Sequence, residues 1–186
     1  MRLGFIVGLF LLPCAAWAHN TIDTPTAPLL AGIIDPILNP AHLLALVSIG
    51  LFAGVSDGSA QWAYPVSLLG ATMLGGFVGY IQPLAEPILV VLVLFLGMAA
   101  FSLLSGSPRV GIGSVIALWG AVHGYLHGLE LTACGGPLFG VGLLVAIGAL
   151  QSTGLLLGIA LGPSRPVVTG TVAALTCLLG LLVVIG

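Results

Sequence analysis

The chain has 186 residues, of which 59% are hydrophobic and only 4% are charged. A water-soluble domain carries about a quarter charged residues, so this composition excludes that class and indicates an integral membrane protein. The formal net charge is −2, and lysine and arginine together number three, which excludes nucleic-acid binding for lack of a basic surface. The phosphate-binding pattern GxxxxGK[ST] does not occur, so no nucleotide is expected to bind.

Residues 1–18 have the features of a cleavable secretory signal peptide. Arg2 precedes an apolar run over residues 3–12, and Ala16-Trp17-Ala18 matches a cleavage site. Cleavage after Ala18 makes His19 the first mature residue. The alternative is an uncleaved first helix, because such segments resemble membrane anchors.

Residues 19–39 are rich in Thr, Pro and Asp and are expected to form an exported segment that caps or enters the membrane domain. Asn39 followed by Pro40 is a favourable N-cap and first-turn pair for a helix over residues 40–55. That span is shorter than the roughly 20 residues a crossing needs. Residues 35–38 are therefore expected to extend it at membrane depth as a broken or re-entrant piece.

Five further membrane spans are predicted from long apolar runs. They cover residues 61–81, 86–104, 111–131, 138–161 and 167–185. The predicted fold is an all-α membrane protein, a bundle of six transmembrane helices in residues 40–186. Glycines recur at four-residue spacing within two of these spans, which predicts closely packed helices; tight packing alone accounts for them.

The two arginines of the mature chain fix the predicted orientation. Arg109 and Arg165 fall in the connections after the third and fifth spans, with Arg109 in a loop over residues 105–110. The positive-inside rule places these connections in the cytoplasm, as the signal peptide also requires. The chain is therefore predicted to lie in the bacterial inner (cytoplasmic) membrane with its mature N-terminus on the periplasmic side.

Two histidines and a glutamate stand out in the fourth predicted span. If this span is helical, His123, His127 and Glu130 lie within about 60° of one another on one face. An ionisable group in hydrocarbon costs at least about 2.5 kcal/mol, so such groups usually serve a function. The alternative is that each histidine is neutral and hydrogen-bonds a neighbouring helix.

Imidazole and carboxylate ligands suit a divalent transition metal. The pattern differs from the protease motif HExxH because Gly124 stands where the catalytic glutamate is required. His42, in the first turn of the first span, lies where the helix dipole favours the neutral imidazole. His19 could add an amine and an imidazole as a chelate, although a polar residue after a cleavage site is also common.

The fourth-span residues resemble a motif of the HupE/UreJ family, Phe-His-Gly-x-x-His-Gly-x-Glu, at His123, Gly124, His127, Gly128 and Glu130. Residues 35–45 stand in place of the family's first-span pattern, His-Pro-x-x-Gly-x-Asp-His-x-x-Ala, and keep its second histidine as His42. Asp35 takes the place of the first histidine and Ala41 that of the aspartate. Tyr125 and Gln151 stand where many members have further histidines.

The resemblance implies a small membrane protein that acts as a nickel or cobalt permease. On this hypothesis the metal ligands are His42, His123, His127, Glu130, Asp35 and His19. Two alternatives remain: an intramembrane metalloenzyme that activates water or oxygen, and a metal-binding accessory protein that serves the maturation of a metalloenzyme without transport. The expected partners are the metal ion, the lipid bilayer and, for the last alternative, the metalloenzyme.

Overall fold

The computed structural model describes residues 28–56, 58–82 and 107–162. These residues form five α-helices and no strand. The helices are α2 (Pro28–Leu38), α3 (Pro40–Gly54), α4 (Ala60–Ile81), α6 (Pro108–Glu130) and α7 (Pro137–Leu161). The predicted signal peptide at 1–18 and the predicted spans at 86–104 and 167–185 lie outside the described residues.

Three of these helices, α4, α6 and α7, are long and apolar enough to cross a membrane. Their bounds agree within three residues with the spans predicted at 61–81, 111–131 and 138–161. The pair α2 and α3 meets the same test together, although it is bent by 77° at a short break. The described part of the chain is therefore all-α, and its apolar helices indicate a membrane protein. The bent pair is a broken span or a re-entrant loop, as expected from the short apolar run.

Asn39 forms the break and starts the next helix. Its side-chain Oδ1 accepts a hydrogen bond from the backbone N–H of His42 at 3.3 Å, and its carbonyl accepts one from Leu43 at 2.9 Å. Pro40 has no N–H to leave unsatisfied at the first helical position. This is the N-cap arrangement that the Asn-Pro pair predicts, and it fixes His42 in the first turn of α3.

The start of α6 differs from the predicted loop over residues 105–110. The helix begins at Pro108, directly after Ser107 in an extended conformation, so Arg109 lies in the first helical turn. Proline is favoured at this position because its fixed φ suits a helix start and its missing N–H costs nothing there. The predicted loop over residues 105–110 was wrong at its end, because residues 108–110 form the first turn of α6.

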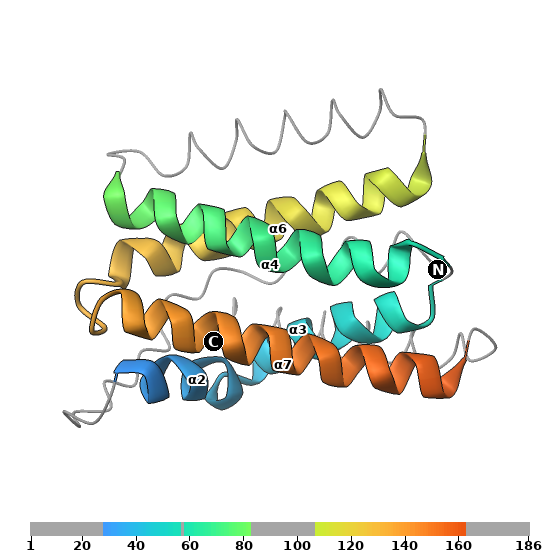
Figure 1. The fold of residues 1–186 in the computed structure, drawn as a ribbon, viewed down its shortest axis with the longest axis horizontal. Coiled ribbons are helices and arrows are strands. Elements are labelled where there is room, and N and C mark those ends of the chain that lie inside the picture. The colour runs from blue at the N-terminus through green and yellow to red at the C-terminus, as the bar shows by residue number, and fades with distance from the viewer. Residues whose placement is uncertain (1–27, 57, 83–106, 163–186) are drawn as a thin grey trace, which may run out of the picture.

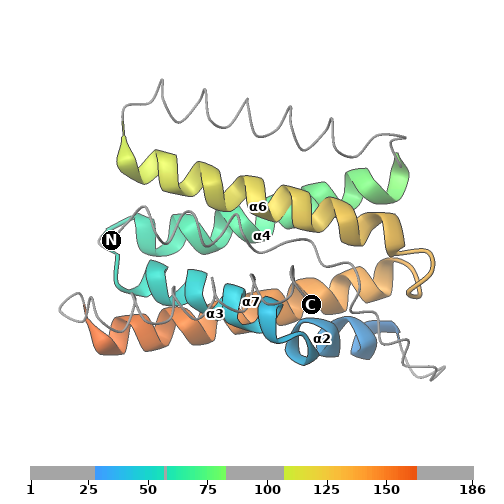
Figure 2. The same ribbon diagram turned by 180° about the vertical axis from the view of Figure 1, so that it is seen from behind.

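The helices pack as two groups, which Figures 1 and 2 show from opposite sides. One group is α4 with α6; in the other, α2 and α3 lie along α7, and contacts between the groups are fewer. Within each group the paired helices run in the same direction. Gly124 faces Thr72 and Gly128 faces Gly76 in the first group, so residue numbers rise together along both helices.

Glycines allow these helices to approach until their backbones touch. At eleven of the described glycines an added Cβ would lie under 3.0 Å from a backbone oxygen of the facing helix, closer than real Cβ atoms come. They are Gly32, Gly50, Gly54, Gly75, Gly79, Gly120, Gly124, Gly128, Gly142, Gly154 and Gly158. Small residues that bring carbonyls against Cα atoms are typical of membrane helix packing. The close packing predicted from glycine spacing is confirmed for these helices.

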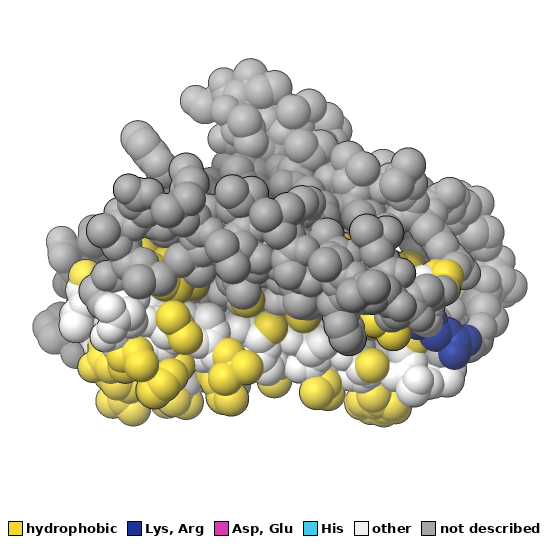
Figure 3. Space-filling model, turned by 90° about the horizontal axis from the view of Figure 1, so that it is seen from above, with side chains coloured by type: hydrophobic (Ala, Val, Ile, Leu, Met, Phe, Trp, Pro, Cys, Tyr) yellow, Lys and Arg dark blue, Asp and Glu magenta, His cyan; other side chains and the backbone are white. Residues whose placement is uncertain are grey.

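The outer faces of the helices carry large apolar side chains. Trp62, Leu74 and Phe77 on α4 and Leu138 and Leu156 on α7 are each more than half exposed. In Figure 3 hydrophobic side chains cover much of the described face, and the basic atoms lie at one end. Such a surface matches lipid rather than water as the surrounding solvent.

Candidate metal centre

Three histidines from two helices meet inside the bundle. His42 of α3 and His123 and His127 of α6 each offer one ring nitrogen, and these three atoms all lie within 4.8 Å of one another. These histidines connect the two helix groups, because α3 belongs to one and α6 to the other. The structure therefore contains a histidine group that could hold a metal ion, which we call the histidine site.

The rings stand edge to face. Ring centroids are 4.7 Å apart for His42 and His123, 4.6 Å for His123 and His127, and 5.8 Å for His42 and His127. A metal about 2.1 Å from each nitrogen would hold the nitrogens roughly 3.4 Å apart in a tetrahedral site. Nitrogens that lie as much as 4.8 Å apart therefore have to move closer before all three bind one ion.

Burial distinguishes the histidine site from solvated surface histidines. His123 is 6% exposed and His127 9%. The Nε2 atom of His123 is buried and has no hydrogen bond within the part of the chain that the structure describes. A histidine that served only as packing between helices would be expected to satisfy this atom, because a buried unbonded polar group costs about 1–3 kcal/mol. A bound cation would satisfy it.

The two carboxylates proposed as ligands lie outside this group of three, toward the turn that joins α6 to α7. Burial raises the pKa of the Cys134 thiol in this turn, and the charges of Glu130 and Asp35 raise it further. Both carboxylates are thus near Cys134, Glu130 as the last residue of α6 and Asp35 from α2. His19, the sixth proposed ligand, lies outside the described residues.

The neighbouring helix α4 packs directly against the glycines beside the histidines. The Cα of Gly124 faces the backbone of Thr72, and that of Gly128 faces Gly76, both on α4. A side chain at either glycine would separate α4 from α6. These glycines therefore set the packing distance next to His123 and His127 and leave no room for an ion.

Trp119 lies next to the site, although nothing in the sequence marks it as a functional residue. Its ring stacks on that of His123, with centroids 4.8 Å apart and planes inclined by 9°. The two residues are four apart on α6, the spacing that brings side chains together on a helix. An apolar aromatic at that spacing is normally read as core, so only the structure distinguishes it.

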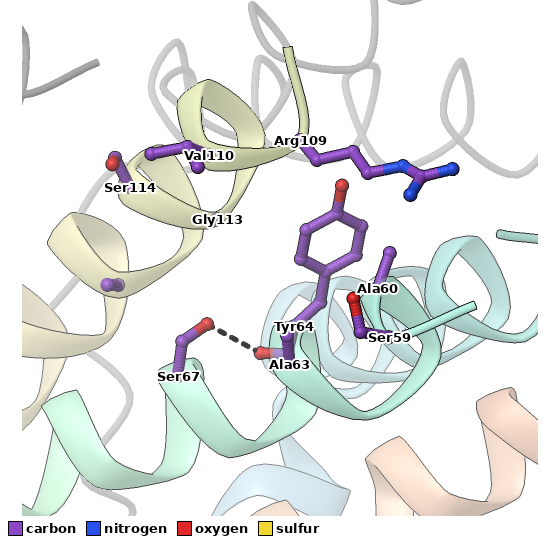
Figure 4. A pocket seen from close by; sticks show the side chains of 10 residues that line it. Ser59, Ala60, Ala63, Tyr64, Ser67, Arg109, Val110, Gly113 and Ser114 are labelled. Carbon is purple, nitrogen blue, oxygen red and sulfur yellow. Dashed lines mark hydrogen bonds between the residues drawn. The ribbon is translucent and has the colours of Figure 1, made fainter. Parts of the chain in front are cut away.

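A separate cavity of about 350 Å³ lies between the starts of α4 and α6. Figure 4 shows Tyr64 and Arg109 at this cavity, with the Ser67 hydroxyl donating a hydrogen bond to the carbonyl of Tyr64 at 2.9 Å. His123 and His127 lie in the last two turns of α6, far along the helix from Arg109 in its first turn. The cavity is thus distinct from the histidine site.

The chain is similar to known proteins over most of its length. A family model described as "HupE / UreJ protein" matches residues 7–183. A relative named "Protein HupE" from Rhizobium leguminosarum bv. viciae is 29% identical over 182 residues, which are 94% of this chain and 93% of the relative. No solved structure matches the chain significantly.

Proposed function

Because the chain belongs to the HupE/UreJ family, we propose that it is a secondary transporter, a permease, for a divalent transition-metal ion, nickel or cobalt. The observation that carries the proposal is the histidine site, in which three imidazole nitrogens from two helix groups lie within 4.8 Å. Neutral imidazole binds nickel and cobalt well, and among the described residues no thiolate joins the three histidines to hold copper(I) or a structural zinc.

The proposed transport step uses weak binding. An ion that has lost part of its hydration shell is bound by His42, His123 and His127, while Asp35 and Glu130 compensate its charge from the end of the bundle near Cys134. The Asn39 cap places the positive end of the α3 dipole near His42. That dipole opposes the bound cation and so favours its release, which a transport site needs as much as binding.

Uptake in cells tests the role of the histidines. We expect His127→Ala to lower nickel and cobalt uptake at least about tenfold, because even the loss of a residue that merely supports a metal ligand costs 10–100-fold. Ser152→Ala is the matched control, since Ser152 is exposed on α7 and hydrogen-bonds only within its own helix. Equal uptake by His127→Ala and wild type, at equal protein levels, would contradict the proposal.

Purified protein in liposomes separates transport from the alternatives. A permease gives metal flux that continues after the protein's own sites are full. An accessory protein gives saturable binding with no flux, and a metalloenzyme retains its metal tightly during washing.

A further inference from the structure

Trp119 of α6 stacks face to face on His123. Its ring lies nearly parallel to that of His123, inclined by 9°, at a centroid distance of 4.8 Å. Trp119 is half-buried and packs against the apolar core, which restricts the movement of its side chain. The stack therefore has one fixed partner and one ring that belongs to the histidine site.

Metal-binding histidines are usually held in orientation by hydrogen bonds. The Nε2 atom of His123, which is open for a metal, has no hydrogen bond among the described residues, and the rings of His42 and His127 stand steeply inclined to its ring. The ring of Trp119 lies parallel to the imidazole instead and restricts rotation of its plane. Stacking thus helps to orient the imidazole while the Nε2 atom stays open for the ion.

The stack also has an electrostatic consequence. An imidazole that donates to a divalent cation becomes electron-poor, and the face of an indole is the best aromatic partner for such a group. The attraction grows when the ion binds, because it depends on the positive charge that the imidazole then carries. An aliphatic side chain of similar size would pack against His123 without this gain.

We propose that Trp119 is a positioning residue of the histidine site, which holds the His123 ring in its ligating orientation and stabilises the metal-bound form by stacking. This inference depends on the proposed metal-binding function. It assigns to Trp119 a part of the affinity for the ion, beyond its contribution to the core.

Binding of Co²⁺ to the purified full-length protein tests the inference, with the ion's visible absorption as the readout. We expect Trp119→Leu to weaken Co²⁺ binding about 3- to 10-fold and Trp119→Phe to restore most of it, because phenylalanine keeps a stacking face. Trp62→Phe, at an exposed position on α4, is the matched control and should leave the affinity unchanged. Equal affinities of the leucine variant and wild type would overturn the inference.

Tryptophan fluorescence gives a second readout that does not require the leucine variant to fold. In a Trp17→Phe, Trp62→Phe background the single remaining tryptophan is Trp119. Bound Co²⁺ or Ni²⁺ should quench its emission, with the same midpoint as the absorption titration. Absorption changes without quenching would overturn the inference.

The experiments also separate this inference from the proposed function. If wild type binds Co²⁺ and transports it but the leucine variant binds equally well, only the role of Trp119 fails. If wild type binds Co²⁺ with the expected dependence on Trp119 but shows no flux in liposomes, transport fails and the positioning role stands. If wild type binds no Co²⁺, both fail.

Discussion

Cys134 shows how the two carboxylates affect a neighbouring residue in the turn between α6 and α7. Partial burial is the main cause that raises the pKa of its thiol, followed by the charges of Glu130 and Asp35. Each of these disfavours the thiolate, which is the nucleophile. At any pH below the raised pKa, Cys134 therefore carries a smaller thiolate fraction than a free cysteine, whose pKa is about 8.5.

Alkylation by a maleimide checks this prediction in a variant with Cys14→Ala and Cys177→Ala, where Cys134 is the remaining thiol. The rate should be lower than that of a free cysteine at pH 7, and its rise with pH should be shifted to higher pH. Glu130→Gln removes one charge, lowers the thiol pKa, and should raise the rate at pH 8 by about twofold or more. An unchanged rate in that variant would show that Glu130 does not act on Cys134.

The residues of the histidine site were predictable to different degrees. His123 and His127 share a face because helix periodicity is local, so their spacing alone brings them together. The approach of His42 depends on how the two helix groups meet, because α3 and α6 lie far apart in sequence and in different groups. The sequence contributed only the family pattern as a guide. Trp119 could not be identified, because a stack on histidine and a core contact have the same spacing.

At the level of the helices, the first span shows where sequence patterns were sufficient and where they were not. The short apolar run predicted a break, and Asn39-Pro40 predicted the start of α3, because capping depends on neighbouring residues only. That residues 28–38 form a helix was not predicted, since Pro36 and Asp35 are typical of turns. Contact with α7 outweighs that local preference.

Two glycines of α4 provide a matched test of helix packing. A Cβ at Gly75 would lie under 3.0 Å from the backbone of Ala121 on α6, whereas one at Gly70 would meet nothing within 4 Å. We expect Gly75→Ala to destabilise the protein by about 1–3 kcal/mol through overpacking. Gly70→Ala should leave it unchanged or stabilise it by up to about 1 kcal/mol through helix propensity.

Thermal unfolding of the two variants in the same detergent measures this difference. Equal midpoints for Gly75→Ala and Gly70→Ala would mean that α4 and α6 do not pack at the distance that the structure gives.

At the level of the whole molecule, the two ends of the bundle should face opposite sides of the membrane. The starts of α4 and α6 lie at one end, since these helices run parallel, and the turn after α6 lies at the other. The positive-inside rule assigns the end with Arg109 to the cytoplasm. Cys134 is then expected on the periplasmic side, which agrees with the orientation that the predicted signal peptide implies.

Labelling with a charged, membrane-impermeant maleimide checks this orientation. In a variant without other cysteines, Cys134 should react in intact spheroplasts. A Ser59→Cys variant that also lacks Cys134 should react only in inside-out vesicles, because exposed Ser59 immediately precedes α4. Labelling of both positions from the same side would refute the assignment.

The division of the bundle into two helix groups has a thermodynamic consequence. A bound ion would link the groups directly, because His42 comes from one and His123 and His127 from the other. Any ligand that binds only one arrangement of the groups stabilises that arrangement by mass action, by about 2.7 kcal/mol at a concentration 100 times its dissociation constant. By the same linkage, a substitution that shifts α3 relative to α6 changes the metal affinity even when every histidine is intact.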